Sequence, residues 1–213
     1  MAHEYRARDL LANPVVIVDT LGPTIVFVGL NAWLGLRAAA IGSVSLSLLL
    51  VAARVWRKER LLYAVSGLGG VLLGVAFALA SGAAEGYFVP GIVTSVVIGV
   101  AYVISIVVKR PLIAVISAAI TRWPLAWYWQ DQVRPAYSEI TWVWAAFYLG
   151  RAALQSLFAV RGEVGWLAVA RVLTGWPSFA VLVVVTYAYI NWRLARLDAP
   201  TVDQWRHSHR PLP

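Results

Sequence analysis

The chain contains no cysteine, which excludes disulfide bonds, thiol nucleophiles and thiolate metal sites and leaves the redox compartment open. Charged residues are also scarce, at 13% of 213 residues, whereas a soluble domain carries about a quarter. The three histidines, His3, His207 and His209, lie near the chain ends, so no histidine-based metal site can form inside an apolar helix. We expect neither a metal nor a cofactor.

Apolar residues are abundant instead: they make up 61% of the chain, and the mean hydropathy is +0.73. Six runs reach the length of about 20 residues that a bilayer-spanning helix needs. They cover residues 14–34, 36–55, 62–81, 89–108, 137–159 and 166–192. The sequence therefore predicts an all-α, polytopic membrane helix bundle. Its net charge of +8 lies mainly in the short gaps between these runs, which is typical of topology signals and not of nucleic-acid binding.

A seventh apolar segment, at residues 111–129, is interrupted by Arg122 and Pro124. If it does not span the membrane, fourteen Lys and Arg residues lie on one side and two on the other; if it spans, the division is nine to seven. The first division is favoured, because Lys and Arg concentrate in cytoplasmic loops. We expect six spans in the plasma membrane, both termini cytoplasmic, and residues 110–135 as an interfacial or re-entrant element. Seven spans are the alternative.

The spans are predicted to form one bundle domain over residues 14–197. It would lie between a cytoplasmic tail at 1–13 and a disordered cytoplasmic tail at 198–213. No signal-peptide cleavage pattern precedes the first span, which is expected to be an uncleaved anchor. The expected partners are the lipid bilayer and a hydrophobic small molecule, without nucleic acid. Assembly into a homo-oligomer stays open.

Four strings of the chain carry a family resemblance. They are SGLGGVLLG, FVPGIVTSVVIGVAYVISIVVKRPLIAVI, YSEITWVWAAFYLGRAALQ and ARVLTGWPSFAVLVV. In order and spacing they resemble an actinobacterial family of small integral membrane proteins catalogued as domain of unknown function 3159, over residues 15–195. More distantly, RPL after the fourth span and the Trp-rich start of the next resemble the intracellular septation protein family. The resemblance implies a membrane location and an acidic residue where Asp19 stands, but no activity.

The span at 137–159 carries a polar face whose members are spaced three or four residues apart, as on one side of a helix. They are Tyr137, Thr141, Trp144, Tyr148, Arg151 and Gln155. Three other spans carry shorter faces of small or polar residues: Ser43, Ser47 and Arg54; Ser95, Gly99 and Tyr102; and Arg171, Thr174 and Ser178. Turning all four faces inward predicts a shared cavity. Close helix packing is the alternative for the small residues.

Two carboxylates, Asp19 and Glu139, are candidate catalytic acids, since a carboxyl group in an apolar site can keep its proton at neutral pH. The alternatives are an ion pair of Asp19 with Arg54 and a helix-dipole role for Glu139. The candidate substrate-binding residues are Tyr102, Trp144, Tyr148, Arg151, Gln155, Arg171 and Trp176. For the two arginines among them the alternative is an ion pair with Glu85 or Glu163. The candidate contacts to lipid headgroups or anions are Arg54, Lys109 and Arg110.

An acid beside aromatic rings in a lipid-accessible cavity is what protonation-initiated cyclisation requires, because the rings can stabilise a carbocation. The first hypothesis is therefore a membrane-embedded, terpene-cyclase-like enzyme acting on an isoprenoid or lipid-like substrate, by analogy of type alone. The second is a small ion or solute transporter or channel component with an inverted repeat, based on the similar strings DTLGPTIV and EGYFVPGIV. The third is a membrane scaffold or a septation- or envelope-associated protein.

Overall fold

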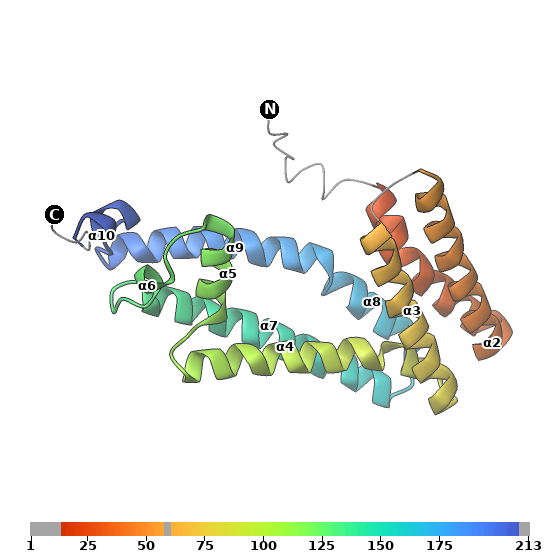
Figure 1. Cartoon of the computed structure of the whole chain (residues 1–213). Helices are drawn as coiled ribbons and strands as arrows, with labels where there is room; N and C mark the ends of the chain where they lie inside the picture. The colour runs from red at the N-terminus through yellow and green to blue at the C-terminus, as the bar shows by residue number, and fades with distance from the viewer. Residues whose placement is uncertain (1–13, 58–60, 209–213) are drawn as a thin grey trace. The chain divides into compact units, whose positions relative to one another are not determined.

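The structure is a computed structural model that describes residues 14–57 and 61–208, with side chains from residues 21–57 and 67–208. Every regular element in these ranges is a helix, which confirms the predicted all-α class (Figure 1). The elements are α2 (Pro14–Trp56), α3 (Leu61–Ser81), the 3₁₀-helix η1 (Ala84–Phe88), α4 (Val89–Val107), α5 (Leu112–Thr121), α6 (Leu125–Tyr128), α7 (Arg134–Val160), α8 (Val164–Leu173), α9 (Trp176–Arg196) and α10 (Val202–Ser208). The predicted tail at 1–13 lies outside the described residues.

Within residues 14–57 and 61–208, four helical stretches are long and apolar enough to cross a membrane. They are Leu21–Trp56, Ala84–Val107, Arg134–Val160 and Val164–Arg196. Large apolar side chains are widely exposed along them, and Trp33 and Val160 are 89% and 88% exposed. An apolar surface of this extent is a liability in water, whereas in a bilayer it contacts lipid tails. The fold is all-helical, with helices whose length and apolar surface are typical of a membrane protein.

Helix α2 consists of two stretches that meet at Gly35. This residue has φ 80° and ψ 178°, a backbone conformation that is essentially restricted to glycine. The chain then turns back on itself (Figure 1), and Gly42 packs against the side chains of Val26 and Leu30. The break therefore falls where the sequence predicted the boundary between the runs at 14–34 and 36–55.

The contacts of the chain divide it into two compact units. Unit 1 contains residues 1–92 and 155–172, and unit 2 contains residues 93–154 and 173–213. The single bundle domain expected over residues 14–197 stays a prediction.

The core of unit 1 forms around three aromatic rings. Phe27 of α2 stacks on Tyr87 of η1 with ring centres 4.2 Å apart, and Tyr87 meets Phe88 edge-on at 5.4 Å. Leu167 of α8 is fully buried in the same cluster. On α3 the close approach depends on Gly74, because a β-carbon there would lie 2.9 Å from both the ring and the backbone oxygen of Tyr87.

Gly74→Ala is expected to lower the free energy of unfolding by about 1 to 3 kcal/mol, the usual cost of overpacking a core. Gly70→Ala is the matched control, since Gly70 lies one turn earlier on α3 and nothing is within 4 Å of the position of its β-carbon. Thermal unfolding of the purified protein in detergent measures both variants. Equal melting temperatures would contradict the contact of α3 with Tyr87.

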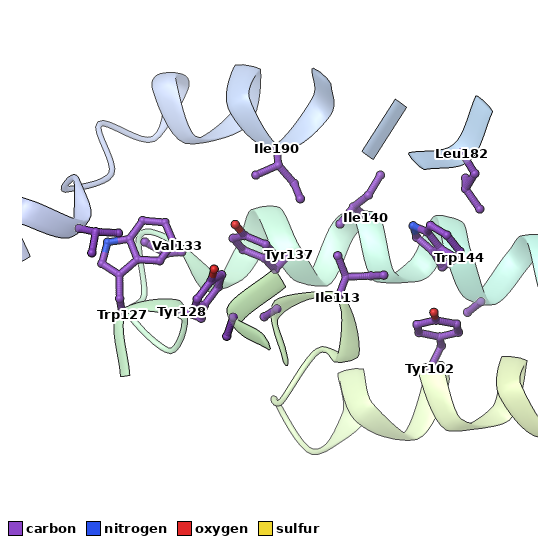
Figure 2. Close-up of a cluster of buried hydrophobic side chains, with 14 residues drawn as sticks. Tyr102, Ile113, Trp127, Tyr128, Val133, Tyr137, Ile140, Trp144, Leu182 and Ile190 are labelled. Carbon is purple, nitrogen blue, oxygen red and sulfur yellow. The ribbon is translucent and has the colours of Figure 1, made fainter. Parts of the chain in front are cut away.

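The core of unit 2 joins α4, α5, α6, α7 and α9 (Figure 2). Figure 2 shows Tyr137, Ile140 and Trp144 of α7 in its middle, with Leu182 of α9 on one side and Tyr102 of α4 on the other. These side chains repeat at three or four residues along α7, so one face of this helix supplies most of the core. The polar face predicted for the span at 137–159 is largely this core-facing side.

Helix α5 has ten residues and rises about 15 Å, half the thickness of a bilayer core, so it is too short to span a membrane. It lies between Lys109 and Arg122, both with φ 57°, the left-handed conformation that commonly ends a helix. The Ser105 hydroxyl accepts a hydrogen bond from the Leu112 backbone N–H at 3.1 Å and thereby links the end of α4 to the start of α5. These features fit the predicted interfacial or re-entrant element.

Polar and aromatic contacts connect α5, α6 and α7. The hydroxyls of Thr121 and Tyr128 lie 3.0 Å apart. The Tyr128 ring meets that of Tyr137 edge-on, with ring centres 5.0 Å apart. Tyr128 is fully buried, and this burial raises the pKa of its hydroxyl, so the phenol stays neutral. The element between α4 and α7 is thus part of the core of unit 2.

The segment after Leu197, for which the sequence predicted disorder, contains helix α10. The Trp127 indole N–H donates a hydrogen bond to the Pro200 carbonyl at 2.9 Å, and Val202 is buried in the core of unit 2. Trp205 packs against the same core. The structure differs from the prediction because these two apolar side chains anchor an otherwise polar segment.

Candidate functional site

The candidate acid Glu139 is held by two side chains of α9. Its Oε1 accepts a hydrogen bond from Arg193 Nη2 at 2.8 Å, and its Oε2 accepts one from Arg193 Nε at 2.8 Å. The Tyr189 hydroxyl donates to the same Oε2 at 2.6 Å. Tyr189 and Arg193 are four residues apart, so both reach α7 from one face of α9. This bidentate ion pair favours the charged carboxylate.

The aromatic candidates of unit 2 pack against one another. The ring of Tyr102 lies 6.0 Å from that of Trp144 and 5.9 Å from that of Tyr148. Trp144 also meets Phe179 edge-on at 5.4 Å, and its indole N–H donates to the Thr186 hydroxyl at 2.8 Å. Tyr102 and Trp144 are buried. The three candidates therefore lie together and contribute to the core of unit 2, while their predicted role in substrate binding stays a prediction.

Arg151 of α7 binds the connection between α8 and α9. Its Nη1 donates a hydrogen bond to the Thr174 carbonyl oxygen at 3.1 Å, just after α8 ends. A carbonyl at a helix end has no partner within its own helix, so this bond supplies one. Another candidate, Trp176, begins α9, is largely exposed and meets Phe179 edge-on at 5.9 Å.

Two polar candidates belong to unit 1. Gln155 is 1% exposed. Arg171 lies with its guanidinium 5.6 Å and 5.7 Å from the ring centres of Tyr87 and Phe88, an arrangement in which the ring faces attract the cation. Among the described side chains Arg171 forms no ion pair, so the pairing with Glu85 or Glu163 considered from the sequence is absent there.

The side chain of Asp19, the second candidate acid, lies outside the described side chains, although its backbone is part of α2. Arg54 lies in the last turn of α2. Lys109 and Arg110 follow α4, and the Arg110 guanidinium lies 4.6 Å from the ring centre of Trp129. In the ranges 21–57 and 67–208, no cluster of three or more His, Asp or Glu side chains is placed to hold a metal ion.

Tyr189 and Arg193 were not predicted as partners of Glu139. In the sequence Arg193 is one of the charges that set the topology, since it lies near the end of the last span. The spacing of the two residues was a usable signal: a phenol and a guanidinium one turn apart can serve one carboxylate on a neighbouring helix.

Comparison with known proteins gives a family and nothing further. The family model described as "Protein of unknown function (DUF3159)" matches residues 14–196. No curated protein and no solved structure matches the chain. The matched range runs from the first residue of α2 to the last residue of α9. The chain therefore belongs to the family of proteins of unknown function DUF3159.

Proposed function

We propose that the protein is a six-span protein of the plasma membrane, with both termini cytoplasmic, that acts as a membrane scaffold and not as an enzyme. The six spans would be the two stretches of α2 on either side of Gly35, then α3, α4, α7, and α8 together with α9. Helix α5 would enter the membrane only partly. This arrangement keeps the division of Lys and Arg at fourteen to two, in agreement with the positive-inside rule.

The scaffold proposal rests on the environment of Glu139. A general acid must hold a proton and present it to a substrate. Both oxygens of Glu139 instead accept hydrogen bonds from Arg193, and one also accepts a bond from Tyr189. An arginine at this distance favours the deprotonated form, which suits an ion pair that joins α7 to α9.

The enzyme hypothesis now depends on Asp19, the remaining candidate acid. The aromatic residues Tyr102, Trp144 and Tyr148 are compatible with it by type, but their mutual packing also serves the core without any ligand. No contact among the described residues favours the transporter hypothesis. Turnover of a lipidic substrate would favour the enzyme, and ion flux would favour the transporter.

Reversing the charge of one partner, in Glu139→Arg or Arg193→Glu, is expected to lower the melting temperature in detergent by several degrees, because it places like charges together. The double variant Glu139→Arg with Arg193→Glu is expected to recover most of this loss. The matched control is Asp131→Arg, since the Asp131–Arg134 pair is an exposed neighbour on the same chain segment. Its effect on the melting temperature should be small.

A second measurement separates scaffold from enzyme. The wild-type protein and Asp19→Asn are incubated with a panel of polyprenyl substrates, and the products are analysed by mass spectrometry. The scaffold proposal expects no turnover in either protein. Turnover by the wild type would overturn the scaffold proposal in favour of the enzyme, and its loss in Asp19→Asn, with an unchanged melting temperature, would assign Asp19 as the acid. Proton or ion flux in liposomes would favour the transporter.

A further inference from the structure

One end of unit 2 carries arginines that lie on tryptophan rings. This end contains the last turn of α4, the first turn of α7 and the last turn of α9, together with α6 and α10 (Figure 1). The guanidinium of Arg110 lies 4.6 Å from the ring centre of Trp129, and that of Arg196 lies 4.4 Å from the ring centre of Trp192. Both arginines are exposed.

Most acidic residues at this end form ion pairs with other arginines. The pairs are Asp131 with Arg134 at 3.1 Å, Glu139 with Arg193 at 2.8 Å, and Asp203 with Arg206 at 3.9 Å. The basic residues that have no acidic partner among the described side chains are Lys109, Arg110, Arg122 and Arg196. Asp198 is the one remaining acid of this end within the described residues. An excess of positive charge is thus left on this surface.

The ring contacts of Arg110 and Arg196 leave their guanidinium groups able to bind an anion. A ring face occupies the flat side of a guanidinium and leaves the N–H groups at its edge free to donate. These N–H groups match the oxygens of a phosphate, to which arginine often binds through two parallel hydrogen bonds. Tryptophan itself concentrates at the headgroup level of membranes, and Trp123 and Trp192 are 41% and 48% exposed.

We propose that this end of unit 2 binds the phosphate groups of anionic phospholipids, with Arg110 and Arg196 as the principal contacts and Lys109 and Arg122 as supporting charges. The proposal relies on the membrane placement given above, since α4, α7 and α9 must end at the level of the headgroups. It does not depend on whether the protein is a scaffold. Zwitterionic lipids carry a phosphate but no net charge and are expected to bind less well.

The test uses the full chain in detergent, with phosphatidylglycerol added as probe and phosphatidylcholine as comparison, and native mass spectrometry to count bound lipid. The wild type is expected to bind phosphatidylglycerol more tightly than phosphatidylcholine. The double variant Arg110→Gln with Arg196→Gln is expected to lose about 30-fold in affinity for phosphatidylglycerol, or about fivefold for each arginine. The loss should shrink as the salt concentration rises.

The matched control is the double variant Arg134→Gln with Arg206→Gln, which removes two arginines of the same end that already pair with carboxylates. Its affinity is expected to stay within about twofold of the wild type. Equal losses in both double variants, or no preference for phosphatidylglycerol in the wild type, would overturn the proposal. If Arg110→Gln with Arg196→Gln does not fold, the single variants Arg110→Gln and Arg196→Gln replace it, each with an expected loss of about fivefold in affinity. Flotation with lipid vesicles tests the membrane placement separately.

Discussion

Gly35→Val is expected to destroy the hairpin formed by the two stretches of α2. The backbone of Gly35 lies in a region that a β-branched residue cannot adopt without a cost of about 1 to 3 kcal/mol or more. If residue 35 became helical instead, the 43 residues of α2 would form one helix about 65 Å long, twice the thickness of a bilayer core. Either outcome removes the turn, so less folded protein should be recovered from membranes.

The chain lacks cysteine, which makes the position of this turn easy to measure. A single Arg37→Cys substitution places one thiol just after Gly35, on the outer side in the proposed topology. We expect a membrane-impermeant maleimide to label it on intact cells, and Gly35→Val to reduce this labelling. Gly29→Val is the matched control, since Gly29 lies inside the first stretch of α2 with nothing within 4 Å of the position of its β-carbon. Unchanged labelling and recovery in Gly35→Val would contradict the hairpin.

Tyr128→Ala is expected to lower the free energy of unfolding by about 3 to 5 kcal/mol, the usual cost of truncating a buried aromatic side chain. Tyr128 is fully buried and meets Trp127 and Tyr137 edge-on at ring-centre distances of 4.9 and 5.0 Å. Its loss would open a cavity between α6 and α7. Thermal unfolding in detergent measures the effect, and a change below about 1 kcal/mol would show that α6 does not pack there.

Tyr128→Phe separates the ring from its hydroxyl. It keeps the packing and removes the hydroxyl that lies 3.0 Å from that of Thr121, so we expect a loss of about 0.5 to 1.5 kcal/mol. Burial raises the pKa of Tyr128, which favours the neutral phenol in the folded protein. Its stabilisation is therefore complete below about pH 10, the usual tyrosine pKa, and is lost as the pH rises further. Tyr128→Phe should remove this part of the alkaline loss, so stability should fall less steeply above pH 10 than in the wild type.

The helices themselves were largely predictable, because apolar run length and glycine chemistry are local properties. The break at Gly35 and the short helix at residues 112–121 follow from such signals. The run predicted at 166–192 is instead two helices, α8 and α9, separated at Thr174 and Gly175. Gly175 and Pro177 are residues at which helices often bend or end. Whether the helix bends or breaks at this position depends on tertiary contacts, such as the hydrogen bond from Arg151 to the Thr174 carbonyl oxygen.

The chemistry of the candidate site was less predictable, because it depends on which helices meet. In the sequence, Glu139 lies in an apolar run, which is typical of a carboxyl group that keeps its proton. In the structure, Arg193 and Tyr189 of α9 bind its carboxylate. The aromatic face of α7 was identified correctly, since its spacing is a property of one helix. That this face packs in the core of unit 2 depends on residues of α4 and α9, which one helix alone does not reveal.

The order of the two compact units along the chain has a consequence for synthesis and for protein engineering. Unit 1 is interrupted by residues 93–154, and unit 2 is interrupted by residues 155–172. No single cleavage of the chain therefore separates the two units. A ribosome that has made α2, α3 and η1 must still make most of unit 2 before Leu167 can join the buried cluster that contains Phe27. Unit 1 begins to fold first and cannot be completed until α8 is made.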